Sequence, residues 1–169
     1  MQTSAKHKFI EQEIAPHVDA GDWKSPGEGE EQYSVDQVIA AYLTGLKTGE
    51  EKADRAIQKQ YSENLTNIGK DTQKIIDKLH EKGFSPISAI LKIVTIGEFE
   101  VLVILPEEEL LREKISEVYS AIGTLIERQS SDAYTFDIVL AGSNDSFNRK
   151  KVSSDGFKLY HKSLVSLAQ

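Results

Sequence analysis

The sequence predicts an α+β protein, in which a long N-terminal helix precedes a small β-β-α-β-β sheet layer with helices packed on its faces. Three observations carry this prediction. Apolar residues recur at helical spacing from Ser34 to Lys82, the pattern changes to a period of two from Ile87 to Leu105 and again over 134–141, and a second helical stripe lies between those two stretches. A length of 169 residues fits one domain with extensions.

The composition argues against several functional classes. The chain carries 20 Lys and Arg residues against 27 Asp and Glu residues, a net charge of −7, which disfavours nonspecific binding to nucleic acid or to anionic membranes. It has no cysteine, and therefore neither a disulfide nor a thiol nucleophile. Since no apolar run approaches the length of a membrane span or a signal peptide, we expect a cytoplasmic protein.

The chain divides into an N-terminal arm (1–33), the long helix (34–82) and a small α+β domain (83–169). The second half of the arm is rich in glycine, proline and acidic residues and follows neither apolar period, which predicts a loop. Trp23 is its only large apolar residue. We expect it to anchor the arm, either on its own domain or on a neighbouring chain.

The long helix is predicted to begin at Ser34, which suits an N-cap, with Gln37 at the capping-box position. Its apolar residues alternate in steps of four and three, as in a coiled-coil seam. Gly49 and Gly69 are possible breaks, but the stripe stays in phase across both. We therefore predict one helix of about 70 Å that ends at Gly83. The alternative is a helix that folds back at these glycines, buries the stripe within one chain and leaves a monomer.

A strand of eight residues spans about 26 Å, so the sheet should cover only the last turns of this helix, from Ile68 to Leu79. The rest of the stripe, Val35 to Leu65, then needs a protein partner, most simply a second copy of the chain. The predicted interface consists of Trp23, Ile39, Leu43, Leu46, Ala53, Ile57, Tyr61 and Leu65.

The remaining elements follow in order along the chain. Alternation over 87–94 and 99–105 predicts a hairpin, and Pro106 followed by three glutamates predicts the start of a helix over 107–128, with Leu111 facing inward. A third strand over 134–141 and a fourth, edge strand over 157–162 flank a polar loop. The second face of the sheet is also apolar, at Ile90, Val94, Leu102, Ile104 and Val139. We expect the helix 107–128 on one face, and the end of the long helix or a partner on the other.

The loop that follows the third strand, 142–151, is the strongest candidate for a ligand site, because sites in α/β layers often follow a strand. Ser143, Asp145, Arg149 and Lys150 could bind an anion there, although an ordinary solvated loop explains these residues better. No Walker loop, glycine-rich dinucleotide motif or nucleophile motif occurs, and we expect neither a cofactor nor a metal. The sequence therefore favours a non-enzymatic interaction or assembly protein that uses its long helix, and the alternative is a ligand-binding protein or enzyme with its site at this loop.

Overall fold

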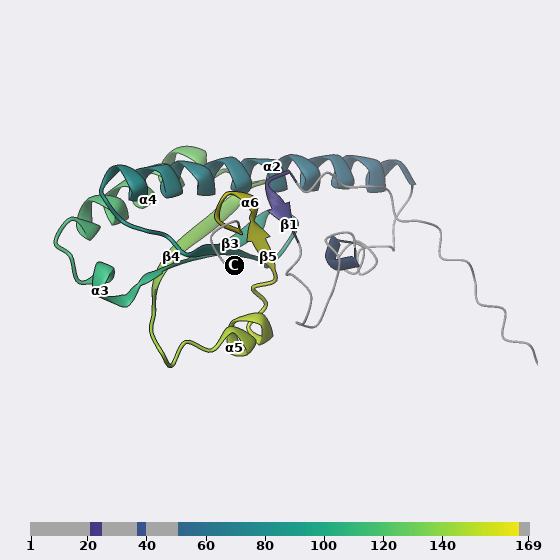
Figure 1. Cartoon of the computed structure of the whole chain (residues 1–169). Helices are drawn as coiled ribbons and strands as arrows, with labels where there is room; N and C mark the ends of the chain where they lie inside the picture. Colours follow the sequence, from purple (N-terminus) through teal and green to yellow (C-terminus); the bar gives the residue numbers. More distant parts are fainter. Residues whose placement is uncertain (1–20, 25–36, 40–50, 166–169) are drawn as a thin grey trace, which may run out of the picture.

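The computed structural model describes residues 21–24, 37–39 and 51–165, excluding the side chains of 51–54 and 165. A long helix lies over a five-stranded sheet of order β1-β5-β2-β3-β4, which confirms the predicted α+β class (Figure 1). The strands are β1 (Trp23–Lys24), β2 (Ser88–Ile93), β3 (Glu98–Pro106), β4 (Thr135–Ser143) and β5 (Leu159–His161). The helices are α2 (Glu51–Glu81), α3 (Glu107–Leu110), α4 (Ile115–Gln129), α5 (Arg149–Ser154) and α6 (Lys162–Val165), and residues 37–39 are also helical.

The long helix α2 runs through Gly69 without a break, as predicted, whereas Ser34 and Gly49 lie outside the described residues. A Cβ atom at residue 69 would lie 3.2 Å from the Asp22 carboxylate and 3.3 Å from Trp23 Nε1. Glycine inside a helix costs about 1 kcal/mol relative to alanine. Here it lets β1 pack directly against the helix backbone.

The apolar stripe of α2 is buried over a longer stretch than predicted. Five of its residues are at most 2% exposed: Tyr61, Leu65, Ile68, Ile75 and Leu79. Burial therefore begins two turns before Ile68, the first residue that we expected the sheet to cover. The extra cover comes from β5 and β1, which add two strands beyond β2 and bring Trp23 against the helix.

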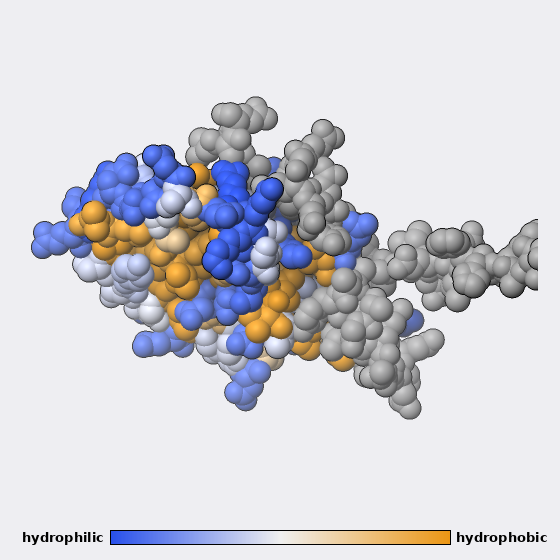
Figure 2. Space-filling view, turned by 90° about the horizontal axis from the view of Figure 1, so that it is seen from below, coloured by the Kyte–Doolittle hydropathy of each residue, from blue (hydrophilic) through white to orange (hydrophobic). Residues whose placement is uncertain are grey.

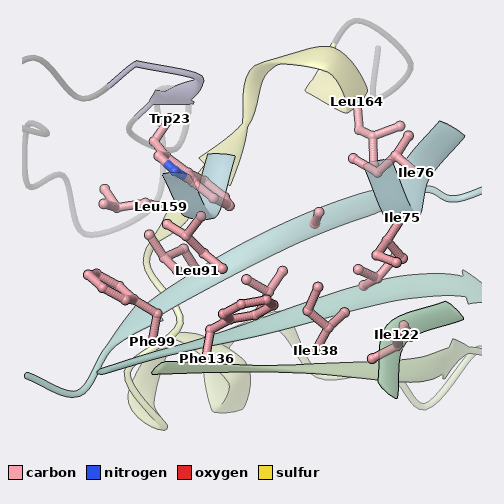
Figure 3. Packing of buried hydrophobic residues seen from close by; sticks show 14 of the residues in the cluster. Trp23, Ile75, Ile76, Leu91, Phe99, Ile122, Phe136, Ile138, Leu159 and Leu164 are labelled. Atoms are coloured by element: carbon pink, nitrogen blue, oxygen red, sulfur yellow. The ribbon is translucent and has the colours of Figure 1, made fainter. Parts of the chain in front are cut away.

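Both main helices lie on the same face of the sheet, which corrects the prediction of one helix on each face (Figure 1). Ile75 and Ile76 of α2 and Ile122 of α4 join one core with Phe136 and Ile138 of β4 (Figure 3). The physical reason is width. Five strands at about 4.8 Å spacing span about 20 Å, and a helix is only about 10 Å in diameter, so two helices side by side are needed for one face.

The second face of the sheet carries no long helix among the described residues. The connection from β4 to β5, which contains α5, lies on this side and meets it at Lys92, whose Nζ is 5.6 Å from the centre of the Phe157 ring. Hydrophobic residues also gather on this underside (Figure 2). Ile90 and Ile104 are 2% exposed, but Val139 is 49% exposed. Part of this face is therefore open to solvent.

The strand pairing confirms the hairpin but corrects the predicted edge strand. β2 and β3 are antiparallel, with Ala89 opposite Val103, and β4 is parallel to β3. β5, predicted to lie at an edge, instead sits between β2 and β1. A strand of two residues in a segment without apolar alternation leaves no pattern to detect, so β1 could not be predicted.

The predicted helix 107–128 is interrupted between α3 and α4. The Glu109 carboxylate is buried, accepts a hydrogen bond from the Ser85 backbone N–H at 2.7 Å, and lies 3.4 Å from Arg112. This contact holds α3 against the loop that follows α2. The chain then turns at Leu111, which is 86% exposed and not inward as predicted.

Candidate functional site

The loop 142–151 is organised mainly by its own polar side chains. Asn144 Oδ1 accepts hydrogen bonds from the backbone N–H and the hydroxyl of Ser146, and Asn144 Nδ2 donates to Glu107 at 3.1 Å. The side chain of Asn148 caps α5 by accepting a hydrogen bond from the Lys151 N–H at 3.1 Å. These contacts shape the loop and fasten it to α3.

The residues predicted to bind a ligand do not converge on a cavity. Asp145, Arg149 and Lys150 are exposed, and Ser143 is half-buried. The loop lines neither the groove between α2 and α4 nor the smaller cavity beside Val38. Within the described part of the chain, no three histidine or acidic side chains are placed to hold a metal. Ligand binding at this loop stays a prediction.

The groove between α2 and α4 has a volume of about 840 Å³ and is open to solvent. Small residues of α4, such as Ser120 and Ala121, line the groove and leave this space unfilled. Its lysines already pair with acids on their own helix, Lys74 with Asp71 at 2.7 Å and Lys78 with Glu81 at 2.9 Å. The charges of these two lysines are therefore partly neutralised, and Arg128 is the remaining cation among the lining residues.

Buried polar side chains hold the arm and the last strand to α2. Trp23 Nε1 donates to the Leu65 carbonyl at 3.2 Å, and His161 Nε2 lies 3.1 Å from the Gly69 carbonyl. Because a carbonyl can only accept, this nitrogen of His161 carries the proton, and Nδ1 is free to accept from the Ser163 hydroxyl at 2.8 Å. Neutral His161 is therefore fully hydrogen-bonded.

We expect His161 to make the stability of the fold depend on pH. Burial lowers its pKa below the ordinary value of 6.5, and this effect exceeds the opposing influence of the Gly69 carbonyl and nearby acids. The full stabilisation is present above pH 6.5 and is lost as the pH falls through the folded-state pKa, because the unfolded chain then binds a proton that the folded chain excludes. We expect His161→Gln to flatten the fall in free energy of unfolding between pH 7 and pH 5, measured by urea denaturation. An unchanged slope would contradict this role.

The exposed large apolar side chains lie on β4, on the segment of α3 and α4 that packs against it, and just after β2. Among the described residues they are Val94 (37% exposed), Leu111 (86%), Tyr119 (49%) and Val139 (49%). Leu111 lies between α3 and α4, Tyr119 on α4 and Val139 on β4, and both α3 and α4 pack against β4. We call the outer edge of β4 together with Leu111, Tyr119 and Val139 the β4 flank.

The outer edge of β4 is suited to pair with another strand. The nine residues of β4 pair with β3 in an unbroken register, and among the described strands β4 has no second neighbour. Edge strands are usually protected by lysine, proline, bulges or short length. β4 contains neither lysine nor proline, and Asp137 is its only charged residue.

The residues predicted to form an interface divide into three groups. Trp23, Ile39, Tyr61 and Leu65 are at most 2% exposed within this chain, so they belong to its own core. Ile57 is half-buried. Leu43 and Leu46, and the side chain of Ala53, lie outside the described part. Sequence reasoning assigned Tyr119 to the inward side of its helix, and it placed Val139 on the second face, which the end of the long helix or a partner would cover. Both are apolar residues that the core does not fully use.

Comparisons with known proteins assign no family. No model of a protein family, no curated protein and no solved structure matches the chain. In the described part of the chain, no helix is long and apolar enough to cross a membrane. The fold and the surface must therefore carry the functional argument.

Proposed function

We propose that this chain is a non-enzymatic assembly protein that self-associates. The observation that supports the proposal is the β4 flank, where exposed apolar side chains lie on or near a strand edge that pairs with no described strand. Apolar patches of this kind on a folded surface mark contact sites for other proteins, and a free strand edge supplies hydrogen-bonding groups for a partner. Neither the groove between α2 and α4 nor the cavity beside Val38 is lined by a histidine or by a pair of acids that would support an enzyme mechanism.

The proposal keeps the predicted class of function but changes the surface. Self-association through the long helix was predicted from a stripe that seemed too long for one domain to cover. Four of the eight predicted interface residues now lie in the core of the chain itself. The β4 flank has the two properties that the stripe was expected to supply, exposed apolar area and freedom from a partner within the described part of the chain.

The experiment measures the molar mass of the purified chain by sedimentation over a wide concentration range. We expect the wild-type chain to form an oligomer and Val139→Lys to shift it toward monomer by at least tenfold in dissociation constant, because a lysine there places like charges in the contact. Val94→Lys is the matched control, since Val94 is also exposed but directly follows β2, which β3 separates from β4. We expect it to leave the oligomer unchanged.

Other outcomes separate the remaining possibilities. A wild-type chain that is monomeric at every concentration would contradict the proposal. If Val139→Lys stays oligomeric but combined replacement of Leu43, Leu46 and Ile57 by glutamate dissociates the chain, then the helix carries self-association as first predicted. A nucleotide or phosphate that raises the melting temperature, and loses this effect in Asp145→Ala and Arg149→Ala, would favour the loop 142–151 as a site.

A further inference from the structure

We propose a specific mode of contact for the self-association proposed above, on which this inference rests. Two copies pair their β4 strands in antiparallel orientation about a two-fold axis at Val139, and the two five-stranded sheets become one continuous sheet of ten strands.

We expect a two-fold contact because the two edge strands of the sheet differ in length. One edge is β4 with nine residues, and the other described edge is β1 with only two paired residues. A head-to-tail arrangement would have to join β4 to β1, and it would leave most backbone groups of β4 unpaired. Pairing β4 with its own copy satisfies the whole strand on both sides. Such a contact closes on itself and stops at a dimer.

The charges of β4 select the register. In an antiparallel pair centred on Val139, Asp137 lies opposite Ala141 of the second copy and Thr135 opposite Ser143, so no like charges meet. A register centred on Asp137 would place two carboxylates directly opposite each other, which is destabilising. The chain carries a net charge of −7, so two copies repel each other in general. β4 has a single charge in nine residues, so the repulsion between two copies is weak along this strand.

The side-chain pattern of β4 is also complementary to itself. Phe136, Ile138 and Leu140 face the helices, whereas Asp137 and Val139 lie on the opposite face. In an antiparallel pair centred on Val139, the side chains of directly opposite residues point to the same face of the sheet. The helix layers of both copies therefore lie on the same side of the joined sheet. The two Val139 side chains then meet on the second face, where each is half-exposed in the single chain.

The α4 helix adds contact area above the paired strands. Tyr119 and Gly123 lie one turn apart, and neither lines the groove between α4 and α2. A Cβ atom at residue 123 would meet nothing within 4 Å, and Tyr119 is 49% exposed. Since α4 packs on β4, a two-fold axis through β4 brings the α4 helices of both copies near each other. In the dimer, the Tyr119 side chain of each copy then packs into the space beside Gly123 of the other copy.

The test uses the absence of cysteine from the chain, which makes a single introduced thiol unambiguous. Opposite residues of an antiparallel pair have Cα atoms about 4.5–5.5 Å apart, within the range of a disulfide. We expect Val139→Cys to form a covalent dimer rapidly under mild oxidation, as seen on a non-reducing gel. Val94→Cys is the control and should cross-link at least tenfold more slowly.

A second cross-linking experiment fixes the register. Asp137→Cys and Ala141→Cys should each stay largely uncross-linked alone, and should form a heterodimer when chains of two different tag lengths are mixed. In the proposed register, residue 137 of one copy faces residue 141 of the other, whereas the two residues 137 lie about four residues apart along the strands, roughly 13 Å.

Charge complementation checks the same contact without cysteine. Val139→Lys and Val139→Glu should each be monomeric and should form a heterodimer when mixed, because opposite charges then meet at the axis. If the wild-type chain is oligomeric but Val139→Cys cross-links no faster than the control, or Asp137→Cys cross-links efficiently by itself, the strand pairing is wrong while self-association stands. A strictly monomeric wild-type chain overturns both proposals.

Discussion

Trp23→Ala is expected to lower the free energy of unfolding by about 3–5 kcal/mol, the range for truncating a large aromatic side chain in a core. Trp23 is 1% exposed, its indole N–H donates to the Leu65 carbonyl, and its ring packs edge-on against His161 at a centroid distance of 5.1 Å. The substitution would leave a cavity where α2, β1 and β5 meet. Urea denaturation followed by circular dichroism measures the effect.

Two variants serve as controls for this expectation. Lys24→Ala alters the neighbouring residue of β1, which is half-exposed, and should change stability by less than about 0.5 kcal/mol, as is usual for surface positions. Trp23→Phe keeps most of the apolar volume but loses the hydrogen bond. Its free energy of unfolding should lie between those of Trp23→Ala and Lys24→Ala. If Trp23→Ala lowers the free energy of unfolding no more than Lys24→Ala does, Trp23 does not contribute to the core in solution.

Asn64→Leu is expected to destabilise the chain by about 2–3 kcal/mol, because a carbonyl left without its donor costs about 1–3 kcal/mol. Asn64 is 1% exposed, and its side-chain NH₂ donates to the Ile96 carbonyl at 3.0 Å and to the Ala133 carbonyl at 2.9 Å. One side chain of α2 thus joins the loops before β3 and β4. Leucine has a similar size but offers no donor.

The matched control lies one turn further along the same helix. Asn67 is exposed, so Asn67→Leu tests the same chemical change without the two buried contacts, and we expect a change within about 0.5 kcal/mol. Chemical denaturation of both variants measures the difference. Equal stabilities for Asn64→Leu and Asn67→Leu would show that the hydrogen bonds from Asn64 add nothing to the net stability.

Local patterns predicted the elements better than their arrangement. The helical spacing from Tyr61 to Leu79 identified the buried face of α2, and alternation identified β2, β3 and β4. The same alternation could not show which face the helices cover, because Ile90, Leu102 and Ile104 make the second face apolar as well. That choice depends on the width of the whole sheet and on how α2 and α4 share it.

The features that could not be predicted depend on contacts between distant residues. β1 exists because Gly69 lets the segment at Trp23 approach α2, and the break between α3 and α4 accompanies the hydrogen bond from Ser85 to Glu109. Neither contact has a local signature in the sequence. The β4 flank is similar, since Tyr119 and Val139 are exposed apolar residues whose shared location follows only from the packing of α4 on β4.

The position of β5 between β1 and β2 has a consequence for how the chain folds during synthesis. Among the described strands, β1 pairs only with β5. Trp23 can therefore pair only after His161, which is 138 residues further along the chain, has been synthesised. Pairing between segments so far apart slows folding, because a long loop must close before the contact forms. β1 cannot join the sheet until β5 has emerged from the ribosome, and any chain cut short before β5 would leave the Trp23 side chain and one side of α2 uncovered.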